Sequence, residues 1–88
     1  TSVKAADGGT VVTAGWEGSY GYLVVIDHGN GERSYYGHNS SLLVSAGDKV
    51  YQGQTIAKAG STGRSTGSHC HFEIRVNGTQ VNPSAYLN

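Results

Sequence analysis

Several features are scarce or missing in this chain of 88 residues, and each one narrows the possible classes of protein. The single cysteine cannot form an internal disulfide. Six acidic and six basic side chains cancel, so the chain has neither the basic footprint of a nucleic-acid-binding protein nor an acidic tail. No apolar run is long enough to span a membrane, and we expect no membrane insertion. Composition alone fixes neither the compartment nor the oligomeric state.

Glycine is abundant, whereas proline and methionine are nearly absent. The chain has 14 glycines, one proline and no methionine, a composition typical of many tight turns between short strands. Its length accommodates one domain with one small core. We therefore interpret residues 1–88 as a single domain.

Short β-prone runs alternate with turn signals along most of the chain. Strands are expected at residues 10–14, 22–27, 33–38 and 55–59. The run at 22–27 is apolar on both faces, as in a central strand, and Asn30-Gly31 is a hairpin signal. Residues 15–21 are expected to form a loop, and residues 39–48 to cross the surface. The sequence predicts a compact, mainly antiparallel β-sheet domain with Gly-rich loops and no long helix.

The stretch of residues 67–78 has the clearest pattern in the chain. As a strand, it would carry His69, His71, Glu73 and Arg75 on one face, and Cys70, Phe72, Ile74 and Val76 on the other. The second row is apolar and suits a strand that rests on a core. We predict a strand over residues 67–76, with His69 and His71 on its polar face and Phe72 and Ile74 buried.

Two histidines on one strand face can serve one chemical site. Neutral imidazole binds zinc well and also transfers protons near neutral pH. The Gly-rich residues 60–67 deliver the strand from a loop, where sites usually lie, and His38 ends another strand-like segment. Taken alone, the pair is also compatible with two exposed histidines that have no chemical role.

Several motifs, in order along nearly the whole chain, resemble the lysostaphin/LytM family of zinc metallopeptidases. They are Tyr-Gly-His at 36–38, AGDKVYQGQTIA at 46–57, GSTG at 60–63 and GSHCHFE at 67–73, with DGGTVV at 7–12 and Val-Asn-Pro at 81–83. The resemblance implies a β-sheet domain that hydrolyses peptide bonds, typically in the cross-links of bacterial peptidoglycan. It also implies a place outside the cell or in the cell envelope of a bacterium, or an association with a phage.

The same resemblance assigns roles to individual residues. It makes His71 a zinc ligand, and His69 and His38 catalytic histidines beside the metal. These roles suit the chemistry, because zinc activates a bound water and neighbouring imidazoles can take up its proton or stabilise the oxyanion. Tyr36 and Arg64 are predicted to contact the peptide substrate.

One part of the family pattern is missing from this span. The family's metal site also uses a His-x-x-x-Asp motif upstream of the Asp-Gly turn that Asp7-Gly8 matches, and this chain contains none. We therefore expect residues 1–88 to be the C-terminal part of a catalytic domain. This span lacks the N-terminal metal-ligand segment, so its zinc site is expected to be incomplete. His28 and Asp7 are interpreted as turn residues. Glu73 is interpreted as a supporting or solvent-exposed residue rather than a ligand.

Two hypotheses about function follow from these observations. The first is a zinc-dependent endopeptidase domain, and the second is a metal-free relative that binds peptidoglycan or regulates another cell-wall hydrolase. The retained histidines, His38, His69 and His71, favour the first. A biotinyl or lipoyl carrier is discarded, because the chain has no methionine and Lys58 lies within an expected strand.

Overall fold

The structure is a computed structural model that describes residues 2–60 and 71–81. The described residues form eight strands: β1 (Ser2–Lys4), β2 (Gly9–Trp16), β3 (Tyr22–Gly29), β4 (Glu32–Leu42), β5 (Lys49–Val50), β6 (Thr55–Ala59), β7 (His71–Val76) and β8 (Thr79–Val81). A single turn of 3-10 helix, η1 (Gly18–Tyr20), joins β2 to β3. Within these ranges no helix has the length and apolar character needed to cross a membrane.

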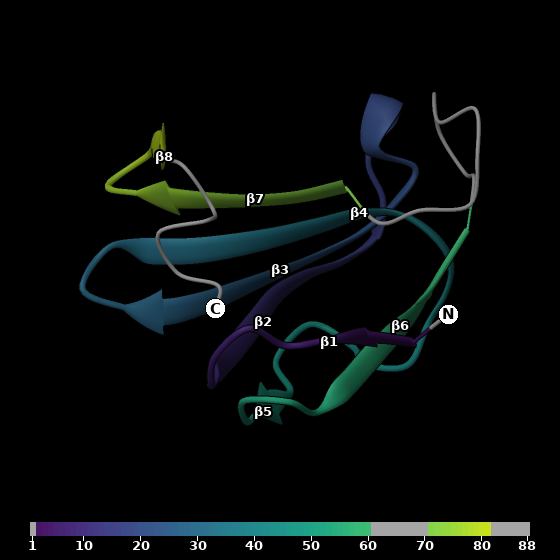
Figure 1. The fold of residues 1–88 in the computed structure, drawn as a ribbon, viewed down its shortest axis with the longest axis horizontal. Helices are drawn as coiled ribbons and strands as arrows, with labels where there is room; N and C mark the ends of the chain where they lie inside the picture. Colours follow the sequence, from purple (N-terminus) through teal and green to yellow (C-terminus); the bar gives the residue numbers. More distant parts are fainter. Residues whose placement is uncertain (1, 61–70, 82–88) are drawn as a thin grey trace.

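All the strands belong to one antiparallel sheet, shown in Figure 1. Its order is β1-β6-β4-β3-β2-β5, and β7 pairs with β4 and with β8. One edge of β4 pairs with β3 between Glu32 and Asn39. On the other edge, Glu32–Gly37 pair with β7, whereas Asn39–Leu42 pair with β6. The pairing partner of this edge of β4 therefore changes at His38, and the sheet branches there. The predicted antiparallel β fold is confirmed.

The predicted central strand and its hairpin are found where the sequence places them. Residues 23–26 of β3 are all buried, as expected for a central strand. Asn30 and Gly31 have φ values of 53° and 79°, so they form a two-residue turn of the type that matches the twist of the strands. Asn77 and Gly78 repeat this arrangement between β7 and β8.

The core lies on one face of the sheet. It includes Val11, Val24, Ile26, Tyr36 and Ile56, with Phe72 packed against it. Ile74 is also buried, so the predicted alternation holds over the described part of the 67–76 strand. Residues 67–70 of that predicted strand lie outside the described residues.

His28 ties the loop after β1 to this core. Its Nδ1 lies 2.7 Å from the carbonyl oxygen of Gly8, and its Nε2 lies 2.7 Å from Ser34 Oγ. The backbone N–H of Ala6 donates to the hydroxyl of Tyr36 at 2.9 Å. His28 lies within β3, one residue earlier than the turn, and both of its ring nitrogens serve the fold. Its structural interpretation is confirmed.

Two boundaries differ from the sequence prediction. β4 continues to Leu42 instead of ending at His38, because residues 39–42 find a pairing partner in β6. β2 extends to Trp16, into the expected loop of residues 15–21, because Trp16 pairs with Tyr22. In both cases a distant or facing strand sets the boundary, which local propensity does not report.

A pair of glycine substitutions in β2 tests the packing of the sheet. A Cβ on Gly9 would collide with the backbone oxygen of Asp27 and lie 2.9 Å from Ile26 Cγ2, whereas a Cβ on Gly15 would meet nothing within 4 Å. We expect Gly9→Ala to lower the free energy of unfolding by about 1–3 kcal/mol, as overpacking does. Gly15→Ala should leave it unchanged or raise it by up to about 1 kcal/mol. Urea unfolding measures both, and an equal loss in the two variants would contradict the close contact.

Candidate active site

His38 occupies a β-bulge in the middle of β4. Val24 pairs with Tyr36 and Tyr22 pairs with Asn39, so β4 has one more residue than β3 between these pairs. His38 has a φ of 61°, in the left-handed region that residues other than glycine rarely adopt. Bulges re-aim side chains and are common beside active sites. Strained backbone of this kind persists only where the surroundings hold it.

Asn39 and Gly60 hold the backbone of this bulge. Asn39 is fully buried, and its Nδ2 donates to the carbonyl oxygens of Tyr22 at 3.0 Å and Tyr36 at 2.9 Å. The N–H of Gly60 donates to the carbonyl oxygen of His38 at 3.0 Å. The bulge is thus fixed to β3 on one side and to the end of β6 on the other. The role of Asn39 has no local sequence signal, because it depends on a strand register that only the folded sheet defines.

The strand that carries the histidine motif begins beside this bulge. His71 is the first residue of β7, and its backbone pairs with Gly37, the neighbour of His38. Figure 1 shows this end of β7 next to β4. The fold therefore brings His38 and the backbone of His71 together. His69, Arg64 and the side chain of His71 lie outside the described residues, so the expected proximity of the His38 and His69 rings stays a prediction.

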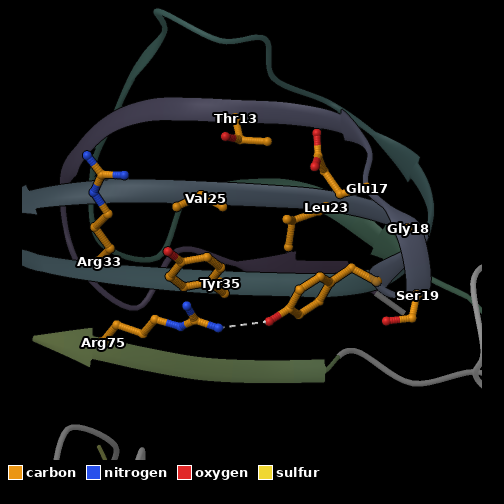
Figure 2. Close-up of a pocket in the computed structure, with 10 residues that line it drawn as sticks. Thr13, Glu17, Gly18, Ser19, Leu23, Val25, Arg33, Tyr35 and Arg75 are labelled. Atoms are coloured by element: carbon orange, nitrogen blue, oxygen red, sulfur yellow. Dashed lines mark hydrogen bonds between the residues drawn. The ribbon is translucent and has the colours of Figure 1, made fainter. Parts of the chain in front are cut away.

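A groove of about 470 Å³ lies on the sheet face opposite the core. Its floor includes Leu23 and Val25, which alternate along β3 with the core residues Val24 and Ile26. η1 closes one end, and Tyr35 and Arg75 line the side toward β7, as Figure 2 shows.

Glu73 anchors the β7 side of the groove. Its side chain is buried, with Oε2 accepting from Arg75 Nε at 2.7 Å and Oε1 accepting from the Tyr20 hydroxyl at 2.8 Å. Arg75 Nη2 also donates to the Tyr20 oxygen at 3.2 Å. This burial excludes the solvent-exposed alternative for Glu73 and makes it a supporting residue of the groove wall.

Aromatic contacts complete the same wall. The guanidinium carbon of Arg75 lies 4.6 Å from the centre of the Tyr35 ring, and the rings of Tyr20 and Tyr35 stack at 6.4 Å. Burial, together with the Glu73 carboxylate, raises the pKa of Tyr20 above its ordinary value. The hydrogen bond to Glu73 likewise raises the pKa of Arg75.

Tyr36 does not share this surface. Its ring is 2% exposed and lies 5.3 Å from the ring of Phe72 on the core side. The prediction of a substrate contact for Tyr36 is corrected accordingly, because side chains alternate along β4 and the groove-lining member of the pair is Tyr35.

The described residues do not by themselves make a metal site. Among them, no three histidine, cysteine, aspartate or glutamate side chains come together as ligands. His71, the predicted ligand, contributes only its backbone to the described part of the chain.

Substitution of Asn39 tests whether its amide holds the bulge. We expect Asn39→Ala to lower the free energy of unfolding by roughly 2–3 kcal/mol, because the carbonyls of Tyr22 and Tyr36 lose a donor. Ser40→Ala is the matched control, since Ser40 is exposed and its hydroxyl bonds are long, at 3.3 and 3.4 Å. Its effect should stay within about 0.5 kcal/mol. Urea unfolding gives both values, and NMR should show the His38 signals shifting only in Asn39→Ala.

A second pair of variants compares the buried carboxylate with an exposed one. Glu73→Gln should lower the free energy of unfolding by about 1–3 kcal/mol, since a half-exposed arginine and a tyrosine lose a charged acceptor. Asp27→Asn removes the exposed 3.4 Å pair with Arg33 and should change it by less than about 1 kcal/mol. Unfolding in urea at pH 7 distinguishes them, and losses of equal size would mean that Glu73 is not the anchor of the wall.

Comparison with known proteins agrees with this architecture. Residues 1–83 match Peptidase family M23. The chain is 47% identical over 87 residues to the murein hydrolase activator EnvC of Escherichia coli (strain K12). The aligned region covers 99% of this chain and 21% of EnvC. The chain therefore spans about a fifth of that relative's length.

Two solved structures extend the similarity to the fold. The catalytic domain of the antimicrobial peptidase lysostaphin from Staphylococcus simulans has a TM-score of 0.91 at 38% identity, over 99% of this chain and 70% of that one. A zinc-containing peptidase from Vibrio cholerae has a TM-score of 0.84 at 35% identity, over 91% of this chain and 25% of that one. The resemblance indicated by the motifs is confirmed. Since the family match extends over most of the sequence and the fold agrees with it, this chain belongs to peptidase family M23.

Proposed function

We propose that the chain is the C-terminal part of a zinc-dependent endopeptidase domain that hydrolyses peptide cross-links of bacterial peptidoglycan, outside the cell or in the cell envelope. The observation that carries the proposal is the strained bulge at His38, placed beside the start of β7 and next to the groove. Tyr20 connects the bulge to the groove. It lines the groove, and a Cβ on Gly37, the neighbour of His38, would lie 2.9 Å from Tyr20 Cδ1.

Each proposed role uses a separate part of this arrangement. His71 is proposed as a zinc ligand, and zinc bound there with further ligands would polarise the scissile carbonyl and lower the pKa of a bound water. His38, whose backbone is held in the bulge, is proposed to take up or donate a proton at its imidazole, and His69 is proposed to have the same role. The groove would hold the peptide in an extended form against the sheet.

A regulatory function is the second candidate. Its specific support is the 47% identity to a murein hydrolase activator. The groove would then bind a protein or peptidoglycan without cleaving it. The two candidates differ in whether the chain, with its metal ligands complete, releases peptides by itself.

Zinc binding and peptide release test the proposal together. We expect the 88 residues to bind zinc weakly and to release little peptide from purified cell wall. The same chain, extended by the coding sequence before Thr1, should bind zinc tightly and cleave. The reason is ligand number, since catalytic zinc sites use three protein ligands and a water, and His71 supplies one. Calorimetric zinc titration and chromatography of released peptides give the two readouts.

A His38→Ala variant of the extended chain separates metal binding from catalysis. Zinc affinity should persist, while peptide release should fall about 10²- to 10⁴-fold, the usual contribution of general acid–base catalysis. Tight zinc binding with cleavage by the short chain would show that a residue interpreted as structural is a ligand. If neither form binds zinc but either one stimulates a separate murein hydrolase, the regulatory function replaces the enzymatic one.

A further inference from the structure

The groove has opposite charges at its two ends. Arg33, on β4, stands at one end, and Glu17, just before η1, stands at the other, as Figure 2 shows. Between them the floor includes the apolar side chains of Leu23 and Val25. An apolar floor with a cation at one end and an anion at the other is complementary to a ligand that carries the reverse polarity.

The two arginines of the groove differ in how firmly they are held. Arg33 and Arg75 pair directly across β4 and β7, where two like charges are unfavourable. Arg75 is neutralised by Glu73 at 2.7 Å and is held over Tyr35. Arg33 makes a 3.4 Å contact with Asp27, and 47% of its side chain is exposed. Such an exposed pair is worth little, so a ligand carboxylate can compete for Arg33 in a two-pronged hydrogen bond.

Glu17 is placed to act as the opposite pole. It precedes η1 as the N-cap residue, but its side chain makes no cap hydrogen bond there. The residue is exposed and lines the groove. Its carboxylate therefore serves neither η1 nor the core.

The spacing of these charges sets a ligand length. Arg33 pairs with Asp27, and Glu17 follows Trp16, which pairs with Tyr22. From Tyr22 to Asp27 along β3 is roughly 16 Å at about 3.3 Å per residue, the length of an extended peptide of about five residues. The Glu17 end also lies closer to the bulge, because Tyr22 and Asn39 are paired.

We propose that the groove binds an extended peptide of about five residues, with its ammonium group at Glu17 and its carboxylate at Arg33. This inference rests on the proposed peptidase function and assigns the groove to the segment C-terminal to the cleaved bond. Hydrolysis consumes one water and leaves a new carboxylate on one fragment and a new ammonium on the other. The second fragment would keep its new ammonium beside the bulge, facing Glu17.

Four pentaalanine probes test this polarity without requiring cleavage. They are the free zwitterion, the N-acetyl form, the C-terminal amide and the doubly capped form, each titrated by NMR into the isotope-labelled 88-residue chain. The zwitterion should bind about 5- to 10-fold more tightly than either singly capped form, and the amides of Leu23 and Val25 should shift. Arg33→Gln should abolish the preference for acid over amide and keep the preference for free over acetylated ammonium. Glu17→Gln should do the reverse, and Lys4→Gln, on β1 and outside the groove, should retain both preferences.

Equal affinity for all four probes, or shifts away from β3, would overturn the inference. The probes could bind with the expected polarity while the extended chain fails to cleave cell wall. This result would contradict the peptidase function and leave the groove as a peptide-binding site. Cleavage of cell wall without any charge preference among the probes would support the peptidase function and overturn the inference about the groove.

Discussion

The side-chain amide of Asn39 fixes the β-bulge at His38, and the site depends on this bulge. It donates to a carbonyl of β3 and to a carbonyl of β4 itself, across the extra residue of the bulge. This extra residue lies where the second edge of β4 changes its pairing partner from β7 to β6. His38 stands at this change of partner, so one buried amide links the branching of the sheet to the placement of the proposed catalytic histidine.

A second set of contacts joins parts of the chain that are far apart in sequence. Tyr20 and Glu73 are 53 residues apart, yet their hydrogen bond fastens η1 to β7. The contact lies where water is partly excluded, so the charges of Glu73 and Arg75 interact more strongly than they would at the surface. It fixes the groove wall relative to the strand that begins with His71.

Sequence patterns predicted the parts of the fold that depend on neighbouring residues. The apolar run of β3, the Asn30-Gly31 turn and the alternation of Phe72 and Ile74 are all local signals, and the structure contains each of them. The extension of β4, the bulge at His38 and the burial of Glu73 depend on partners more than ten residues away. For Tyr36, the pattern located the motif but did not tell which of two adjacent tyrosines faces the groove.

Successive side chains point to opposite faces of the sheet, so the exposed groove residues and the core residues are separate sets. Arg33 is exposed in the groove, on the face opposite the core residues Val24 and Ile26, whereas Glu73 is buried in the groove wall. Substitutions at exposed groove residues such as Arg33 can therefore change what the groove binds, while the apolar face and the buried Glu73 preserve the architecture.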